Sequence, residues 1–200
     1  LIVDHAQAPG EKIRISGGGR CNFTNLDTRP EAFLSRNPRY CISALKRFTQ
    51  RDFIARVDAA GIAWHEKTLG QLFCDGSAKQ IVAMLLEECE RGAVTLRLGG
   101  ETGAVEHRDG QFHVAGATAP KLVIATGGPS IPKLGASPFA YELARQFGLK
   151  VVQPRPALVP LTLSGEDALF AELSGVATEV IAKCGKAAFR EAALFTHRSE

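Results

Sequence analysis

The sequence predicts an α/β fold, namely a Rossmann-like domain with a mostly parallel sheet and one antiparallel meander of three strands. Short apolar runs alternate along the 200 residues with segments of helical periodicity, which is typical of a parallel sheet. Two apolar runs continue into glycines, at Gly17–Gly19 and Gly127–Gly128. A third apolar run, at the start of the chain, ends in Asp4. Because ligands of open α/β sheets bind beyond the carboxyl ends of the strands, these three places predict a binding site.

The expected elements begin with a strand at residues 1–4, followed by a loop that extends to Lys12. A helix is expected to begin at Pro38, because proline suits the first helical position. The next helix has Thr49 as its N-cap and ends at Gly61. Apolar residues recur at helical spacing within it, which predicts one buried face.

Two short strands are expected on either side of Gly70, and a long amphipathic helix then begins at Ser77. Ser77 and Gln80 have the spacing of a capping box. The apolar period next changes to two, which predicts a three-strand meander from about Thr95 to Val114. Asp109–Gly110 supplies the hairpin turn within it.

The last elements of the sheet are a buried strand and a helix. The run "KLVIATGG" predicts the strand at residues 121–125, directly before the glycines. Pro138 and Gly148 bracket the helix, since proline is favoured at a helix start and glycine just past its end.

Composition restricts the classes of protein. With 45% hydrophobic and 22% charged residues, the chain is globular, and its net charge of +3 comes from scattered residues. We therefore expect no nucleic-acid partner and no membrane partner. The five cysteines form no CxxC pair, which argues against a disulfide framework or a zinc site. No apolar run approaches the roughly 18 residues of a membrane span, and a cytoplasmic location is expected.

The stretch "ISGGGRCNFTN", Ile15–Asn25, is the strongest local signal. Glycine loses more backbone freedom on folding than any other residue, so three in succession indicate a close approach or positive φ angles. A ligand or a tight surface turn explains the run equally well. For Asp4, the alternatives are a ribose contact and a turn-forming aspartate.

Three stretches resemble a bacterial family of FAD-binding flavoproteins, usually described as NAD(P)/FAD-dependent oxidoreductases, which includes an aminoacetone oxidase and a bile-acid dehydroxylation reductase. They are "PGEKIRISGGGRCNFTN", "HEKTLGQLFCDGSAKQIV" and "KLVIATGGPSIPKLGASPFAYELARQFGLKVVQPRPALVPL". They occur in the order found in the family, and the similarity covers essentially the whole chain. The resemblance implies a glutathione-reductase-like FAD domain followed by a β-rich inserted domain.

The resemblance also implies a set of cofactor contacts. Asp4 matches the acidic residue at the adenosine ribose, and Thr102 stands where the family contacts adenine through backbone. The glycine turn close to the cofactor corresponds to Thr126, Gly127 and Gly128. The loop around the flavin and its phosphates corresponds to Lys12, Ser16, Gly17, Gly18, Gly19, Arg20, Cys21 and Asn22.

Two departures from the family pattern affect the expected organisation. No GxGxxG motif, which normally opens such a domain on its first strand, is present in the chain. The family pattern around His197 also stops abruptly. We therefore expect an internal part of a longer flavoprotein, with an incomplete FAD domain at 1–156 and the start of a β-rich domain at 157–200. Residues 154–160, rich in proline, are expected to link them.

Several polar residues have competing interpretations. Cys21 beside Arg20 is either a reactive thiol or a small buried residue, and its lack of a nearby partner cysteine disfavours a disulfide relay. Arg20 either neutralises a phosphate or pairs with a carboxylate. Adjacent His65 and Glu66 point to opposite faces of a strand, so shared acid–base catalysis is not expected. No catalytic residue is assigned.

The predicted function is that of an FAD-dependent oxidoreductase, which transfers a hydride or electron pair between a small organic molecule and the flavin. NAD(P)H and oxygen are both compatible with the second half-reaction. The alternative is a nucleotide-binding or interaction module without turnover, which the absent GxGxxG favours. A flavoprotein that modifies RNA has the right fold class, but the scattered charges argue against it.

Overall fold

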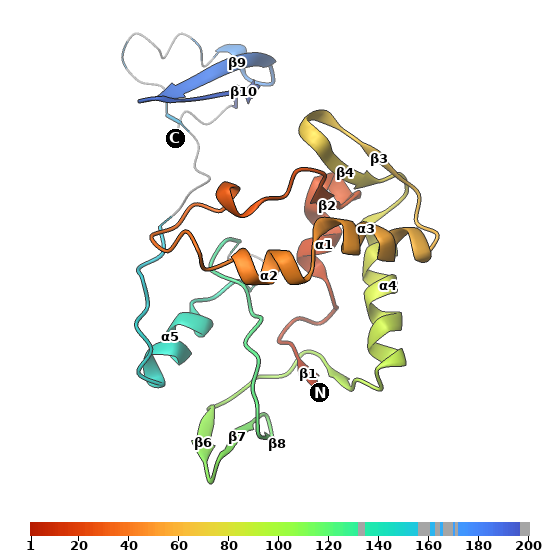
Figure 1. Ribbon diagram of the computed structural model, residues 1–200, viewed down its shortest axis with the longest axis vertical. Coiled ribbons are helices and arrows are strands. Elements are labelled where there is room, and N and C mark those ends of the chain that lie inside the picture. Colours follow the sequence, from red (N-terminus) through yellow and green to blue (C-terminus); the bar gives the residue numbers. More distant parts are fainter. Residues whose placement is uncertain (132–134, 156–160, 163–164, 166–169, 171, 197–200) are drawn as a thin grey trace. The chain divides into compact units, whose positions relative to one another are not determined.

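The computed structural model describes residues 1–131, 135–155, 161–162, 165, 170 and 172–196 (Figure 1). The chain divides into two compact units, Leu1–Val151 and Val152–Glu200, and each is described by itself. Most of the expected linker at 154–160 lies outside the described residues, and so does His197.

The first unit contains a parallel strand pair that carries Asp4 at its end. β1 (Ile2–Val3) lies parallel to β5 (Leu96–Arg97), with Ile2 opposite Leu96. The ladder extends beyond the strands, because the Asp4 amide donates to the Arg97 carbonyl at 2.9 Å and the Gly99 amide to the Ala6 carbonyl at 2.9 Å. The carboxyl end of β1 is therefore fixed against the segment that follows β5.

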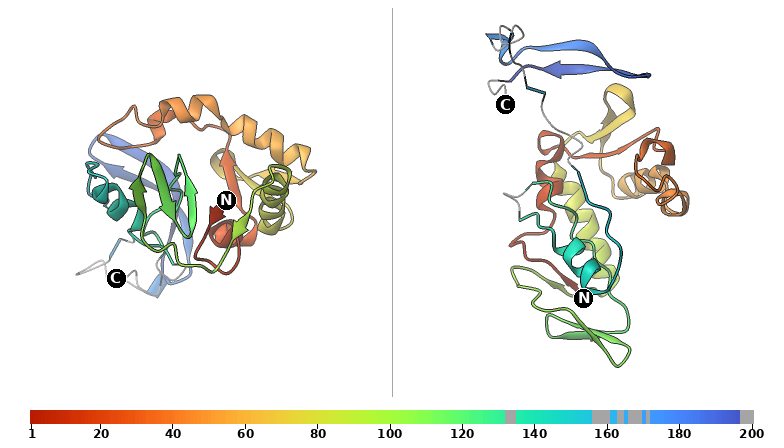
Figure 2. Two further views of the ribbon diagram at one scale, coloured as in Figure 1. Left: turned by 90° about the horizontal axis from the view of Figure 1, so that it is seen from below. Right: turned by 90° about the vertical axis from the view of Figure 1, so that its left-hand side faces the viewer.

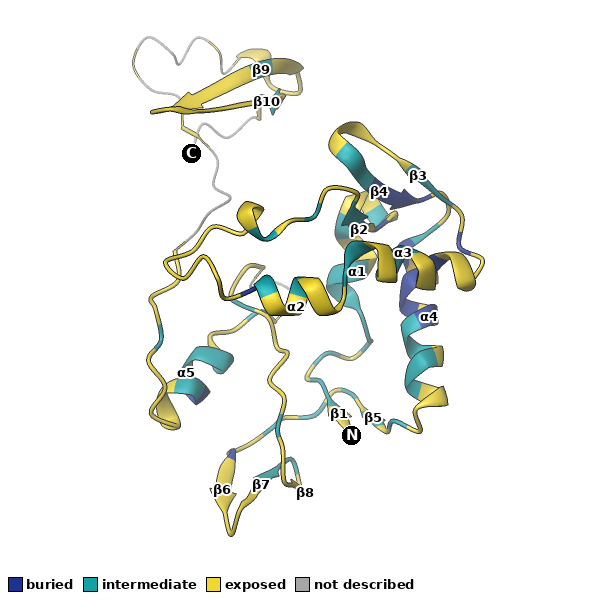
Figure 3. Cartoon of the chain, in the orientation of Figure 1, coloured by how far each residue is buried: buried dark blue, intermediate teal, exposed yellow. Residues whose placement is uncertain are grey.

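A second, antiparallel sheet in this unit has the strand order β2–β4–β3. The strands are β2 (Asn22–Asn25), β3 (Trp64–Glu66) and β4 (Gln71–Cys74). Two amphipathic helices, α3 (Gln50–Ala59) and α4 (Ala78–Arg91), contribute to the same core. Its buried members are Cys21, Val57, Ile62, Cys74, Ala78, Ile81 and Met84, and Figure 3 shows this burial on β4, α3 and α4.

The expected N-cap at Thr49 and the expected capping box at Ser77 are present, and Thr49 also forms a capping box. The Thr49 hydroxyl accepts from the Asp52 amide at 3.3 Å while the Asp52 carboxylate accepts from the Thr49 amide at 2.7 Å. These bonds from Thr49 hold the pKa of the exposed Asp52 carboxyl below its ordinary value. Ser77 and Gln80 form the same reciprocal pair at the start of α4.

Five short helical elements were not predicted, or begin elsewhere than predicted. α1 (Glu11–Ile15) spans the end of the expected loop and the apolar run before the glycines, so the expectation that these glycines follow a strand is wrong; Gly10, with a φ of +70°, provides the turn that starts the helix. Helix α2 (Ile42–Arg47) begins four residues later than Pro38. The 3₁₀ turns are η1 (Ser16–Gly19), η2 (Pro30–Ala32) and η3 (Thr68–Gly70).

The three-strand meander exists, but its members differ from the prediction. It consists of β6 (Glu106–Arg108), β7 (Gln111–Val114) and β8 (Ala117–Ala119), seen as neighbouring green strands in Figure 2. β5 pairs with β1 instead. The predicted turn at Asp109–Gly110 is confirmed, and a second two-residue turn follows at Ala115–Gly116. Ala115 has a φ of +51°, which alanine rarely adopts, so no local signal announced that turn.

The prediction of a buried strand at residues 121–125 is wrong. The structure assigns no strand there, and the side chain of Val123 is 84% exposed. A strand requires a partner for its backbone groups, and no described segment forms a ladder with this one. The helix after it, α5 (Phe139–Gln146), forms as expected and is followed by Gly148 with a φ of +72°.

The second unit contains a β-hairpin. β9 (Ala177–Cys184) lies antiparallel to β10 (Ala187–Leu194), and Gly185 in the turn has a φ of +58°. Most of the side chains of both strands are exposed. Throughout the described ranges, each helix is too short or too polar to traverse a lipid bilayer.

The packing of the core predicts which thiols react. Burial, followed by the nearby Cys21, raises the pKa of the Cys74 thiol to about 11, and Cys74 is fully buried. At pH 8 a thiol with this pKa is ionised in only about one molecule in a thousand. We expect iodoacetamide to modify the exposed Cys184 first and to leave Cys74 unmodified in native protein, as measured by peptide mass spectrometry. Denatured protein should be modified at both cysteines, and rapid native modification of Cys74 would contradict the described core.

Candidate functional site

The glycine loop, defined here as Ser16–Arg20, connects α1 to β2 through left-handed backbone. Gly17, Gly18 and Gly19 have φ angles of +58°, +65° and +86°, which glycine adopts without steric penalty. Cys21 follows with a φ of +56°, which is uncommon for a residue with a side chain. The loop is closed by the Cys21 amide, which donates to the Ser16 carbonyl at 3.0 Å.

The first two glycines are required for different reasons. A Cβ atom at Gly17 would lie 2.6 Å from the Phe73 ring and 2.9 Å from the Asn22 amide nitrogen, so only glycine allows the loop to pack against β4. A Cβ atom at Gly18 would meet no atom within 4 Å. The loop is therefore pressed onto Phe73 on one side and open to a ligand at Gly18.

Lys12 joins α1 to the second glycine turn. Its ammonium group donates to the Ser130 hydroxyl at 3.1 Å and lies 3.8 Å from the position of a Cβ atom on Gly127. Gly128 is likewise close to the Tyr141 hydroxyl, which lies 3.2 Å from its Cβ position. The structure thus brings Lys12 close to the turn at Thr126–Gly128, although neither Lys12 nor this turn follows a strand as the sequence led us to expect.

Asp4 lies at the end of β1 and shapes the turn that follows. Its carboxylate accepts from the Ala6 amide at 3.0 Å and lies 3.5 Å from Nδ1 of His5. The His5 ring contacts the position that a Cβ atom on Gly135 would occupy. The turn-forming role of Asp4 is therefore present, and its half-exposed side chain remains open to a further contact.

The remaining site residues predicted from the sequence separate into groups. The Cys21 thiol is buried in the core beside Cys74, so Cys21 can face a ligand only through its backbone. Arg20 is exposed, and its carbonyl accepts from the Cys74 amide at 3.0 Å. Asn22 is the first residue of β2, opposite Phe73. Thr102 lies at the base of the meander, where its carbonyl accepts from the Ala115 amide at 3.2 Å.

The glycine loop and Lys12 fit the phosphates of a dinucleotide cofactor. The backbone at Gly18 is accessible without interference from a Cβ atom, Arg20 carries a positive charge two residues along the chain, and Lys12 carries one at the turn of Gly127. Gly127, whose Cβ position would lie 3.8 Å from the Lys12 ammonium group, places no side chain against that group. This combination of an open glycine backbone and cations is what phosphate binding requires.

His65 has a different partner from the neighbour considered in the sequence. Its Nδ1 atom lies 2.6 Å from the Asp75 carboxylate, and its ring stacks on Phe73 with centroids 6.2 Å apart. Glu66 is exposed, as expected for the opposite face. Because Phe73 also supports Gly17, the pair of His65 and Asp75 is only one aromatic ring away from the glycine loop.

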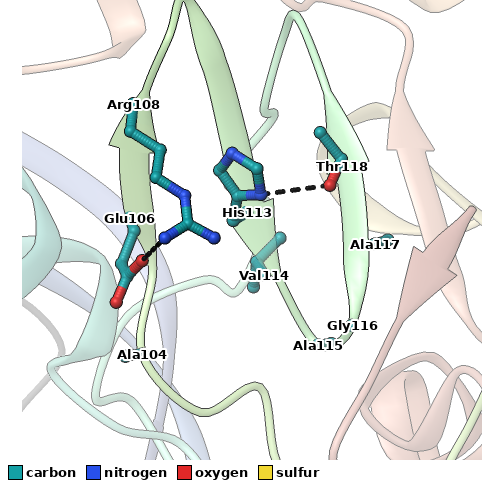
Figure 4. Close-up of a pocket in the computed structure, with 9 residues that line it drawn as sticks. All are labelled: Ala104, Glu106, Arg108, His113, Val114, Ala115, Gly116, Ala117 and Thr118. Carbon is teal, nitrogen blue, oxygen red and sulfur yellow. Dashed lines mark hydrogen bonds and ion pairs between the residues drawn. The ribbon is translucent and has the colours of Figure 1, made fainter.

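A shallow pocket of about 300 Å³ lies on the meander, away from these residues (Figure 4). Its polar lining is already engaged, since Arg108 pairs with Glu106 at 3.6 Å and His113 bonds to Thr118 at 3.1 Å. None of the residues expected to bind the cofactor lines it. The meander pocket therefore does not change the assignment of the candidate site to the glycine loop.

One concentration of positive charge was not predicted from the sequence. Residues 29–51 contain six basic residues and one acidic residue, Glu31, so their net charge is +5. The rest of the chain has 18 basic and 20 acidic residues, a net charge of −2. Averaging the charge over the whole chain concealed this concentration, which a count in windows of about twenty residues would have found.

Comparison with known proteins places the chain in a family. Residues 1–192 match a family described as "HI0933-like protein Rossmann domain". The chain belongs to this family. The predicted α/β Rossmann-like fold is confirmed by this match together with the parallel and antiparallel pairings described above.

Two similar relatives are named "Ribosomal RNA dihydrouridine synthase". The one from Escherichia coli strain K12 is 56% identical over 206 aligned residues, which cover 99% of the chain and 51% of the relative. The one from Haemophilus influenzae is 44% identical over an alignment that covers 98% of the chain and 51% of the relative. The chain thus spans about half the length of these curated relatives.

A more distant relative is the "3-dehydro-bile acid delta(4,6)-reductase" of Clostridium scindens, which is 27% identical over 90% of the chain and 44% of its own length. These relatives are enzymes, which agrees with the flavin-type oxidoreductase that the resemblance implies. The expectation of a small-molecule substrate and no nucleic-acid partner is wrong, because the relatives at 56% and 44% identity are named for ribosomal RNA.

The packing of the glycine loop predicts a difference in stability between two matched variants. Gly17→Ala introduces a Cβ atom against Phe73, and we expect it to lower the free energy of unfolding by about 1–3 kcal/mol more than Gly18→Ala does. Both positions have similar positive φ angles, so the strain of the left-handed backbone is common to the two variants. Urea unfolding measures the difference. Equal destabilisation would show that Phe73 does not constrain the loop.

Proposed function

We propose that the protein is a flavin-dependent reductase that converts uridine to dihydrouridine in ribosomal RNA. The observation that carries this proposal is the 56% identity, over 99% of the chain, to a ribosomal RNA dihydrouridine synthase. The glycine loop supports it, because the open backbone at Gly18 offers a place for the phosphates of a flavin dinucleotide.

FAD is the proposed cofactor and NAD(P)H the proposed reductant. A bound flavin, once reduced by NAD(P)H, would supply the hydride that adds to one carbon of the 5,6 double bond of uracil, and a proton from solvent would complete the other carbon. In this assignment Gly18 admits the pyrophosphate to the backbone, and Lys12 neutralises a phosphate. The side chain of Asp4 contacts the adenosine ribose, while Thr126, Gly127 and Gly128 border the cofactor. Ser130 holds the Lys12 ammonium group in place through its hydroxyl.

The remaining contacts of the proposed site are made by backbone. Cys21 contributes through its peptide group, since its thiol is in the core. Thr102 would contact adenine in the same way, as the family resemblance implies. Arg20 ends the loop and Asn22 begins β2. Arg20 differs from the other residues of this group, because its side chain would contribute a positive charge.

Substitution at Gly18 tests the cofactor assignment. Gly18→Val adds a branched side chain where the backbone is open. We expect this side chain to block the approach of the cofactor and to weaken FAD binding by more than tenfold in the purified protein. The flavin absorbance retained after gel filtration, and titration of apoprotein with FAD, measure the change. Gly61→Val is the matched control, because Gly61 also has an open surrounding and a φ of +66° but lies at the end of α3. Unchanged affinity in Gly18→Val would remove the glycine loop from the site.

The activity is tested in ribosomal RNA directly. Cells that lack the gene should lose dihydrouridine at one or more positions of their ribosomal RNA, as measured by mass spectrometry of RNA digests. Expression of the wild-type protein should restore it, and expression of Gly18→Val should not. Dihydrouridine that is unchanged by deletion of the gene would overturn the proposed substrate.

A further inference from the structure

The segment at residues 29–51, called here the basic arm, has charge and exposure that the glycine loop does not explain. Its basic residues are Arg29, Arg36, Arg39, Lys46, Arg47 and Arg51. Only Arg29 forms an ion pair within the described part of the chain, with Asp27 at 2.9 Å. Five cations therefore face solvent without a carboxylate partner among the described residues.

Aromatic side chains are interleaved with these cations. Tyr40 is 57% exposed and Phe33 is 39% exposed, and the nearby Leu34 is almost entirely exposed. Phe48 differs from them, because it packs edge-on against Phe53 and lies 5.0 Å beneath the Arg56 guanidinium. Phe48 thus anchors the arm to α3, whereas Phe33 and Tyr40 are available for contact with a partner.

The arm has little core of its own. Every residue from 31 to 40 is exposed, and Cys41 is the arm's buried residue (Figure 3). Large apolar side chains left in water are unfavourable unless a partner covers them. The combination of exposed aromatic rings and unpaired cations matches a nucleic acid, since rings stack on bases and cations neutralise phosphates.

The base of the arm lies at the end of β2 that is farther from the glycine loop. The Gln50 side chain donates to the Leu26 carbonyl at 2.9 Å, and the Thr28 hydroxyl donates to the Asn25 carbonyl at 2.9 Å. The arm therefore leaves and returns at the end of β2, the strand that follows the glycine loop (orange in Figure 1). A four-residue strand is about 13 Å long, so the arm begins about that distance from the loop.

We propose that the basic arm binds single-stranded RNA and presents it to the glycine-loop site. This inference rests on the proposed function. Phe33 and Tyr40 stack on unpaired bases, while Arg36, Arg39 and the cations of α2 contact the phosphates. Single strands are favoured over duplexes, because stacking requires bases that are not already paired.

The experiment compares two variants with the same change in charge. In the arm variant, Arg36→Gln, Arg39→Gln, Lys46→Gln and Arg47→Gln are combined. The control combines four exposed cations elsewhere, as Arg91→Gln, Lys150→Gln, Lys183→Gln and Lys186→Gln. The probes are a fluorescent, uridine-containing 20-nucleotide single strand from ribosomal RNA, the same sequence as a duplex, and unmodified ribosomal RNA transcribed in vitro. Binding is measured at several salt concentrations.

We expect the arm variant to bind the single strand at least tenfold more weakly and to lose up to about three units of salt slope, because each phosphate contact contributes about 0.7. The control should bind like the wild type. Phe33→Ala with Tyr40→Ala should weaken binding by about 5- to 150-fold for each base that loses its stacking partner, with little change in salt slope. FAD absorbance should be retained in every variant.

The outcomes separate the two proposals. If the wild type binds none of the RNA probes, the proposed function and the role of the arm both fail. If it binds and the arm variant binds equally well, only the arm is excluded. Equal affinity for the duplex would overturn the assignment to single strands. If the wild type is a dimer, and the variant with Phe33→Ala and Tyr40→Ala is a monomer with unchanged RNA affinity, the arm joins two copies of the chain instead.

Discussion

The candidate site depends on how closely the glycine loop approaches the ring of Phe73. A Cβ atom on Gly17 would lie 2.6 Å from a carbon of the Phe73 ring, so there is no space for a side chain at this position. Glycine also allows the left-handed backbone with which the chain turns there. The same turn directs the Cys21 thiol into the core and begins β2 opposite Phe73. The outer face of the loop, at Gly18, is open as a result.

This arrangement links stability to the proposed chemistry. The inner side of the loop belongs to a core formed by β4, α3 and α4, in which burial raises the pKa of the Cys74 thiol. The outer side is open at Gly18, where a Cβ atom would meet no other atom within 4 Å. In the proposed function the packed inner face positions the backbone, and the outer face receives the phosphates.

The same strand connects the loop to the basic arm. β2 carries the glycine loop at one end and the base of the arm at the other, and Gln50 ties the returning chain to Leu26. One short strand, β2, thus separates the glycine loop from the exposed and positively charged arm. The arm carries a net charge of +5, against −2 for the rest of the chain, and the proposed contact with RNA phosphates rests on this difference.

Local patterns in the chain were sufficient for features whose physical cause is local. The capping boxes at Thr49 and Ser77, the turn at Asp109–Gly110 and the helix after Pro138 each depend on residues within a few positions of one another. Positive φ angles at Gly17–Gly19 were likewise foreseeable from glycine itself. Contacts between distant segments were decided only in the tertiary structure: the parallel pairing of β5 with β1, the partner of His65, and the bond from Lys12 to Ser130. The strand expected at residues 121–125 shows the limit most clearly, because its apolar pattern reports a preference for burial, whereas a strand forms only where another segment offers its backbone groups.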